Sequence, residues 1–277
     1  MTMEIEPMRY FVSFLLLAGM AHPGLAQATA KQANDRVSAR TDSQFVLQAS
    51  TDYTQGQFDG QEYETVSASA GAAYTHGRLT LSASIPYLVT TAPENLVVSQ
   101  GGLLGTPLFA TPTSQTTRVR RQGIGDLTLQ AAYQLPTHGF EAVVAGAAKV
   151  PTASRQDGLG SGAFDYGVSG QISKRLGPIV PFVSAGYTFI GQTEGFAVHN
   201  TVSGSAGASF TLGRSSALSL SYAYEQSATD LIGDRQSVGI ALGTQLAPRL
   251  RMGLNGSAGV STGAPDAQVG LHIGLGF

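Results

Sequence analysis

Apolar and polar residues alternate along most of this chain with a period of two. The last eleven residues show the pattern most clearly. Apolar side chains occupy every second position from Ala267 to Phe277, with Gln268, His272 and three glycines between them. A period of two is typical of a β-strand, since successive side chains point to opposite faces. The sequence therefore predicts an all-β protein.

The alternation predicts twelve strands joined by connections that are short and long in turn. The expected strands cover residues 45–53, 66–74, 79–89, 127–135, 140–150, 164–172, 179–190, 202–212, 218–226, 238–246, 250–260 and 267–277. Tight turns are expected near residues 76, 138, 177, 214 and 248. A polar loop is expected from Gln55, and a long segment without sustained alternation from Thr91 to Gln122.

An even strand number, with short turns at one end and longer loops at the other, is typical of outer-membrane β-barrels. The sequence thus predicts a single-chain 12-stranded antiparallel transmembrane β-barrel over residues 43–277, with both termini in the periplasm. A soluble β-sandwich or β-helix is the alternative, but no fixed repeat supports a solenoid. The final Phe277 is expected to be the C-terminal residue that the barrel assembly machinery reads.

The two faces of the expected strands differ in chemistry. One face carries mainly Leu, Ile, Val, Ala, Phe and Tyr, and the other carries mainly Ser, Gly, Thr and Ala. Small polar residues inside a barrel of this size predict a water-filled lumen. Aromatic residues near the strand ends predict two interfacial girdles. The expected girdle residues are Tyr53, Tyr87, Phe164, Tyr166, Phe189 and Tyr224 at one end, and Phe45, Tyr74, Tyr133, Phe140, Phe210 and Phe277 at the other.

The composition agrees with a membrane barrel. Only 12% of the residues are charged, about half the share in an average soluble domain. The formal net charge of −2 gives no indication of a nucleic-acid partner, and the absence of cysteine excludes disulfides. Residues 1–26 are expected to be a signal peptide, with Ala28 or Ala30 as alternative ends and Met8 as an alternative start. Residues 27–42 are expected to be a periplasmic lead-in.

Several motifs resemble a family of outer-membrane proteins described as "MetA-pathway of phenol degradation" or as "transporter". The motifs are Thr51-Asp52-Tyr53, Ser84-Ile85-Pro86-Tyr87, Gly123-Ile124-Gly125-Asp126, Lys149-Val150-Pro151-Thr152, Asp165-Tyr166 and Pro181-Phe182 with Gly186-Tyr187. The resemblance covers most of residues 50–195 and, more loosely, the rest. It implies an outer-membrane channel for small compounds, with aromatic compounds among them.

Three charged residues of these motifs form the sharpest candidate site: Asp126, Lys149 and Asp165. All three take the lumen-facing register. Strand pairing is expected to place Lys149 opposite both carboxylates, near the outer mouth. Opposed residues have Cβ atoms about 5 Å apart, so ion pairs are expected. The cluster is interpreted first as a structural ion pair, with a charge filter as the alternative.

Other charged residues are weaker candidates. Glu225 and Arg235 are expected to form a second lumen pair. Arg78, Glu141, Arg249 and Arg251 are expected at the periplasmic mouth, where solvated rim charges are the first interpretation and an electrostatic funnel the second. Arg118, Arg120 and Arg121 are either a solvated loop cluster or a contact for lipopolysaccharide phosphates, which arginine binds well.

The histidines give no strong indication of an enzyme. A lipid-modifying enzyme would need a Ser–His pair on the membrane face with an orienting carboxylate, and no such spacing is evident. No catalytic residue, cofactor or metal site is expected. The sequence predicts a porin-like outer-membrane channel for passive uptake of small molecules, gated sterically by Thr91–Gln122. The expected partners are outer-membrane lipid, lipopolysaccharide, the assembly machinery and the permeant. A non-conducting structural or surface-interaction barrel is the first alternative.

Overall fold

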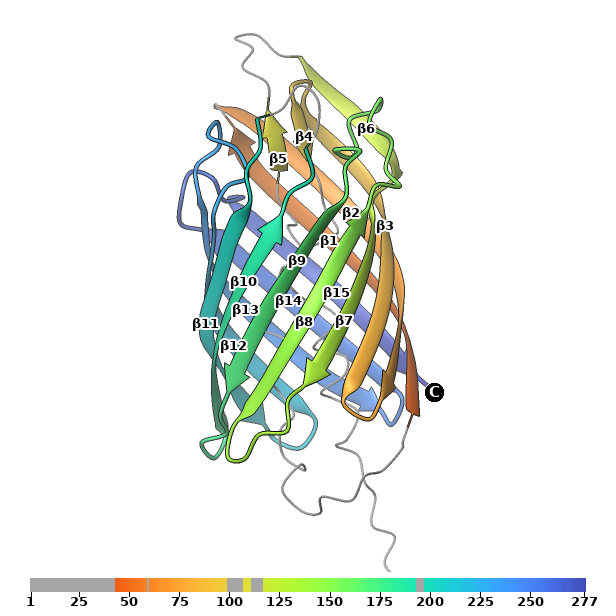
Figure 1. Ribbon diagram of the computed structural model, residues 1–277, viewed down its shortest axis with the longest axis vertical. Helices are drawn as coiled ribbons and strands as arrows, with labels where there is room; N and C mark the ends of the chain where they lie inside the picture. Colours follow the sequence, from red (N-terminus) through yellow and green to blue (C-terminus); the bar gives the residue numbers. More distant parts are fainter. Residues whose placement is uncertain (1–42, 59, 99–106, 111–116, 193–196) are drawn as a thin grey trace, which may run out of the picture.

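The computed structural model describes residues 43–58, 60–98, 107–110, 117–192 and 197–277 (Figure 1). The strands are β1 (Ser43–Phe58), β2 (Gln61–His76), β3 (Leu79–Pro93), β4 (Leu96–Val98), β5 (Pro107–Ala110), β6 (Arg118–Ile124), β7 (Leu127–Gln134), β8 (Glu141–Val150), β9 (Asp165–Ser173), β10 (Ile179–Phe189), β11 (Thr201–Leu212), β12 (Ser216–Glu225), β13 (Arg235–Ala247), β14 (Leu250–Gly259) and β15 (Ala267–Gly276). The expected signal peptide and lead-in lie outside the described residues. Within those ranges no helix is long and apolar enough to cross a membrane.

The strands close into one antiparallel barrel. β1 pairs with β15 from Val46↔Gly276 to Gln55↔Ala267, and β2 pairs with β3, so the sheet has no free edge there. β6 and β7 both pair with β3 and are interrupted only at Gly125–Asp126, so they share one position in the wall. Because β6 and β7 count as one position, the thirteen strands of the sheet form a barrel with twelve strand positions, as the sequence predicted. Closure removes the unpaired edge that would otherwise invite aggregation.

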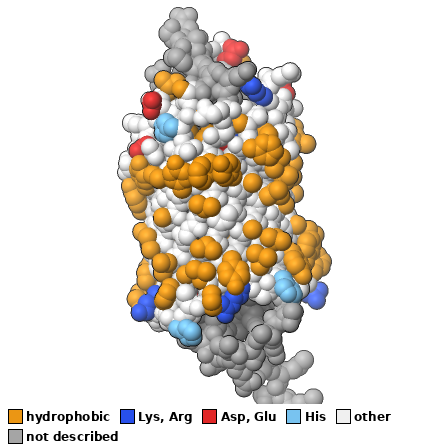
Figure 2. All heavy atoms as spheres, viewed as in Figure 1, with side chains coloured by type: hydrophobic (Ala, Val, Ile, Leu, Met, Phe, Trp, Pro, Cys, Tyr) orange, Lys and Arg blue, Asp and Glu red, His pale blue; other side chains and the backbone are white. Residues whose placement is uncertain are grey.

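The outer surface of the barrel is apolar in the middle and charged at the ends. Outward-facing residues such as Leu81, Ile240 and Val269 are about half exposed. In Figure 2 the apolar side chains of this face gather in two bands, with the coloured charged side chains above and below them. Inward-facing residues such as Thr65 and Ser209 are polar and buried. This is the arrangement that a bilayer requires, because lipid accepts the apolar face and the ladder satisfies the backbone.

The strands at the looped end extend further than the sequence predicted. β1 and β2 pair as far as Phe58↔Gln61, so the polar loop expected from Gln55 is instead a continuation of the hairpin. The outward residues of this continuation, which include Gln57 and Glu64, are polar and exposed. In these strands, apolar and polar residues alternate only where the outward face contacts lipid. Beyond the membrane the outward face is polar, so the outward apolar residues that mark the pattern are missing, although the ladder continues.

Strand ends were also predicted as loop in the long segment from Thr91 to Gln122. β3 continues to Pro93, and β6 pairs with it from Tyr87↔Ile124 to Pro93↔Arg118. Between them β4 and β5 form a separate two-stranded ladder. The connections at the opposite end are short, as predicted. Four of them contain a glycine with positive φ, at Gly77 (59°), Gly139 (80°), Gly177 (65°) and Gly213 (70°), which suits the tight turns of hairpins.

Candidate functional site

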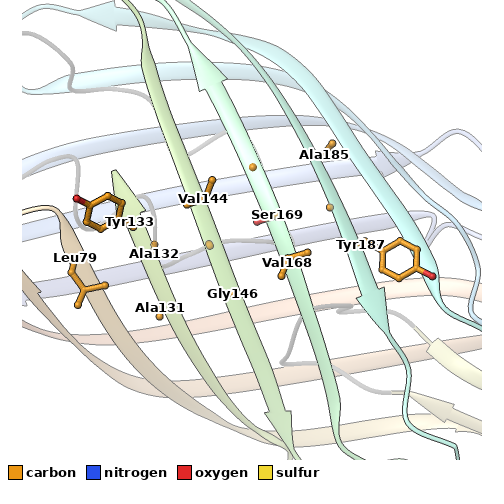
Figure 3. Close-up of a pocket in the computed structure, with 13 residues that line it drawn as sticks. Leu79, Ala131, Ala132, Tyr133, Val144, Gly146, Val168, Ser169, Ala185 and Tyr187 are labelled. Atoms are coloured by element: carbon orange, nitrogen blue, oxygen red, sulfur yellow. The ribbon is translucent and has the colours of Figure 1, made fainter. Parts of the chain in front are cut away.

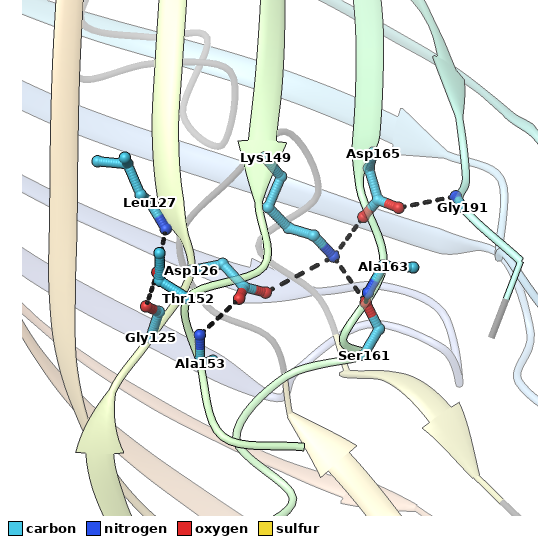
Figure 4. Close-up of polar contacts among 10 residues, drawn as sticks. All are labelled: Gly125, Asp126, Leu127, Lys149, Thr152, Ala153, Ser161, Ala163, Asp165 and Gly191. Carbon is cyan, nitrogen blue, oxygen red and sulfur yellow. Dashed lines mark hydrogen bonds and ion pairs between the residues drawn. The ribbon is translucent and has the colours of Figure 1, made fainter. Parts of the chain in front are cut away.

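The charged cluster lies at the looped end of β7, β8 and β9 (Figure 4). Lys149 is the penultimate residue of β8 and stands directly opposite Asp165, the first residue of β9. Asp126 lies at the interruption between β6 and β7. The register predicted for Lys149 and Asp165 is therefore confirmed.

The register predicted for Asp126 is wrong by two residues. Lys149 stands opposite Thr128, not Asp126. Asp126 nevertheless reaches the lysine because the ladder has ended before it, which frees the backbone of Gly125–Asp126 from the pleat of β7. The ladder of β7 and β8 is regular, but its turn is centred between residues 138 and 139, one residue later than predicted, and this shifts the register by two residues.

The ammonium group of Lys149 contacts three polar side chains. Its Nζ forms an ion pair with Asp165 Oδ2, lies 3.7 Å from Asp126 Oδ2, and donates a hydrogen bond of 3.0 Å to Ser161 Oγ. The lysine and both carboxylate side chains are only 1–3% exposed. The sequence gives no indication of Ser161, since a serine in a Gly-rich loop has no distinguishing pattern. Such a buried cation is stable only when it is paired and hydrogen-bonded.

The two carboxylates also fix backbone outside the strands. Asp126 Oδ1 accepts the N–H of Ala153 at 3.0 Å, and Asp165 Oδ1 accepts the N–H of Gly191 at 2.9 Å. Ala153 belongs to the β8–β9 loop, and Gly191 follows β10. The cluster thus connects two loops to one another through a single lysine. Hydrogen bonds to charged groups are about twice as strong as neutral ones.

The loop of residues 151–164 packs closely over the cluster. Leu159 is buried against Leu88 of β3 and Ala153. A Cβ on Gly160 would lie 2.7 Å from Ala153 Cβ and 3.1 Å from Asp126 Oδ2, so only glycine fits there. These contacts separate the charges from solvent, which favours the structural interpretation over an exposed charge filter.

The second lumen pair is present as predicted. Glu225 and Arg235 are opposed residues at the looped ends of β12 and β13. Arg235 Nη1 lies 3.7 Å from Glu225 Oε2, and both side chains are largely buried.

The residues predicted at the other mouth do not form one group. Arg78 and Arg249 are exposed in turns, whereas Arg251 is an inward residue of β14 and only 5% exposed. Glu141, at the start of β8, faces Arg175 of the β9–β10 turn. Partial burial lowers the pKa of Arg175, and the negative charge of Glu141 opposes this shift. The pairing with Arg175 was not predicted from the sequence.

The three arginines of β6 also separate into two kinds. Arg118 and Arg120 are exposed on the outward face. Arg121 points inward, and its guanidinium donates hydrogen bonds to the carbonyls of Leu96 (2.7 Å), Glu94 (2.7 Å) and Pro93 (3.3 Å). Arg121 therefore fixes the chain between β3 and β4, and it does not share the surface of the other two.

A shallow apolar groove of about 720 Å³ lies on the outer wall across β7 to β10 (Figure 3). Val144, Val168 and Tyr187 border it, and Gly146 and Gly170 line its floor. The three bordering side chains are among the exposed apolar residues of the belt. The groove therefore opens toward lipid and not into the lumen.

One Ser–His pair of the kind that an enzyme would need occurs at the short-turn end of the barrel. There, Ser43 Oγ lies 2.9 Å from His76 Nδ1. None of the described carboxylates forms an ion pair with His76, so the third member of a catalytic arrangement is not provided there. The described residues also contain no group of three or more acidic, histidine or cysteine side chains that could hold a metal ion.

The fold and the apolar belt define the class: a closed twelve-stranded β-barrel of the outer membrane. One solved structure with the same fold is an outer-membrane channel of the COG4313 group from Pseudomonas putida F1. It is 12% identical, with a TM-score of 0.63, and the match covers 85% of this chain and 95% of that one. The translocator domain of the autotransporter NalP from Neisseria meningitidis is a more distant match, with 11% identity, a TM-score of 0.49 and coverage of 86% and 88%. The CymD monoaromatic hydrocarbon channel matches with 13% identity, a TM-score of 0.43 and coverage of 84% and 87%.

The chain belongs to the family described as "putative MetA-pathway of phenol degradation", whose profile matches residues 95–277. The resemblance inferred from the motifs is thus confirmed. The motifs at residues 51–53 and 84–87 lie before the matched region. A comparison with curated protein sequences finds no match.

Proposed function

We propose that this barrel is a passive channel, through which small molecules diffuse across the outer membrane. The observation that supports it is the sorting of the wall: apolar residues face lipid, and inward positions carry small polar residues such as Thr65, Ser205 and Ser219. A barrel that needed only a solid core would fill its interior with large apolar side chains. The similar fold of a protein described as an outer-membrane channel supports the same class of function.

The lengths of the connections support one orientation. The short turns, such as Gly77-Arg78, would face the periplasm together with both termini, and the extended hairpins and loops would face outward. The segment Thr91–Gln122 would then restrict the outer mouth sterically. Residues 99–106 and 111–116 of that segment lie outside the described residues.

Aromatic or other hydrophobic compounds are the permeant class we favour, and the family description, which names phenol degradation, supports this choice. We further propose two partners for the surface. Arg118 and Arg120, exposed on the outward face of β6, would contact lipopolysaccharide phosphates, and Phe277 would be read by the assembly machinery. No catalytic role is proposed.

A non-conducting barrel is the second candidate, and the loop that packs over Lys149 favours it, since this loop narrows the looped end. A liposome-swelling assay separates the two. Proteoliposomes should swell in isosmotic solutions of phenol-sized solutes and more slowly as solute size increases. Swelling no faster than that of protein-free liposomes for every solute, with a folded barrel, would favour the non-conducting candidate.

A further inference from the structure

Three polar side chains meet on the lumen wall where the first and last strands close the barrel. They come from adjacent strands: Asp52 from β1, His272 from β15 and Asn255 from β14. Asp52 and Asn255 stand opposite Gly270 from its two sides, and His272 is the next inward residue of β15. The alternation of residues 267–277 sets His272 on the face opposite the apolar side chains, but no pattern in the sequence singles out Asp52 and Asn255.

The imidazole of His272 contacts both of the other side chains. His272 Nε2 lies 2.7 Å from Asn255 Oδ1 and 3.7 Å from Asp52 Oδ1. Ser50 Oγ donates a long hydrogen bond of 3.4 Å to Asp52 Oδ2. The cluster therefore contains one carboxylate, one amide and one imidazole, and the imidazole is the group that can change charge near neutral pH.

Gly270 makes this convergence possible. A Cβ at that position would collide with Asp52 Oδ1 and would lie 2.7 Å from Asn255 Oδ1. The two side chains thus extend over the glycine from either side. Asp52 Oδ1 and Asn255 Nδ2 have no hydrogen-bond partner among the described residues. An acceptor and a donor left unsatisfied on a lumen wall are costly unless water or a permeant completes them.

The neighbouring charges are few. The charged residue of β1 that faces His272 is Asp52. The charged residue of β14 on this side is Arg251, which stands opposite Gly274, the next inward residue of β15 after His272. Among the described residues these are the charged groups that face His272 from the two strands paired with β15. With a neutral imidazole the three-residue cluster carries a charge of −1, and with a protonated imidazole its charge is zero.

We propose that Asp52, Asn255 and His272 form a selectivity site of the channel, which attracts small cations through its carboxylate and loses this preference when His272 takes up a proton. This inference rests on the proposed channel function. A fixed charge on a lumen wall selects permeants by sign, because the surrounding wall has a low dielectric constant. The carboxylate supplies the attraction, and Asn255 holds the imidazole beside it.

The test is the ratio of potassium to chloride permeability, obtained from reversal potentials of the full barrel under a KCl gradient. Wild-type protein should lose cation preference by about two- to fivefold between pH 8 and pH 5, because one unit charge at 4 Å in water contributes about 1 kcal/mol. His272→Gln should show the same ratio at both pH values. Asp52→Asn should lack the cation preference at pH 8. All of these ratios are measured in a Glu225→Gln background, in which the carboxylate of the other lumen pair cannot contribute to the pH response. Gln130→Ala, at an uncharged inward position of β7, is the matched control and should respond to pH as the unsubstituted background does.

The outcomes distinguish the two proposals. A folded barrel without conductance overturns the channel function, and this inference with it. A conducting barrel whose selectivity changes with pH equally in wild type and His272→Gln overturns the selectivity site alone. Loss of barrel stability in His272→Gln with unchanged selectivity would assign the cluster to closing β1 on β15 instead. If His272→Gln does not fold, a pH 8 selectivity in Asp52→Asn equal to wild type overturns the site in the same way.

Discussion

Replacing Lys149 by methionine should destabilise the barrel strongly. Methionine keeps the unbranched shape of the side chain and removes its charge. Asp126 and Asp165 would then face one another with no cation between them, and each would retain only one hydrogen bond from a backbone N–H. Removing one partner of a buried ion pair costs about 3–5 kcal/mol, since the remaining charge is left uncompensated. Here two carboxylates are left, so the upper part of that range is expected.

The free energy of unfolding can be measured by urea titration of the barrel refolded in lipid vesicles, followed by circular dichroism. Lys174→Met is the matched control, because Lys174 is exposed in a turn and should change the free energy by about 0.5 kcal/mol or less. The triple variant Asp126→Asn, Asp165→Asn, Lys149→Met should be more stable than Lys149→Met alone, since it has no uncompensated charge.

The reasoning would be refuted if Lys149→Met unfolded at the same urea concentration as the wild type and the Lys174→Met control. A variant of unchanged stability whose ion selectivity had shifted would place Lys149 in contact with the permeant. The charge-filter interpretation would then replace the structural one.

Three further changes test other parts of the structure. Gly160→Ala should destabilise by about 1–3 kcal/mol because its Cβ has no room, whereas Gly146→Ala, with no atom closer than 3.9 Å, should be neutral in the same urea titration. Arg121→Ala leaves three carbonyls without their donor and should speed proteolytic cleavage near residues 93–96, measured by mass spectrometry of the fragments. The Ser227 N–H and the Tyr224 hydroxyl hold the pKa of the Asp234 carboxyl below its usual range, so the stabilisation of this loop is present above the usual pKa and is lost as the pH falls through the lowered one. The Ser227 amide should therefore exchange much more slowly than its intrinsic rate at pH 6, and this protection should be lost at pH 2. Asp234→Asn should remove the difference in protection between the two pH values.

The membrane part of the fold could be predicted because lipid imposes a simple rule on it. Outward residues in the belt are mostly apolar, so segments such as 79–89 and 267–277 alternate visibly. Above the membrane the rule no longer holds. The end of β1, the start of β2 and β6 as far as Gln122 were predicted as loops, because Gln57, Glu64 and Arg118 are polar on the outward face.

The candidate site was predictable where the ladder is regular. Lys149–Asp165 and Glu225–Arg235 follow directly from the antiparallel register. The contact of Asp126 with Lys149 was expected from a register that is wrong by two residues, whereas Ser161, which lies in the β8–β9 loop outside any ladder, could not be found in this way. The contact of Asp52 with His272 joins the two ends of the chain, and it requires the closure of the barrel, which no local pattern contains.

The central claim is that the barrel conducts, and single-channel recording of the refolded protein in a planar bilayer tests it most directly. The account predicts discrete, steady conductance steps from protein that migrates as a folded barrel on unheated gels. Protein that is folded by the same criterion, inserts into the bilayer and gives no conductance at any voltage would contradict the account.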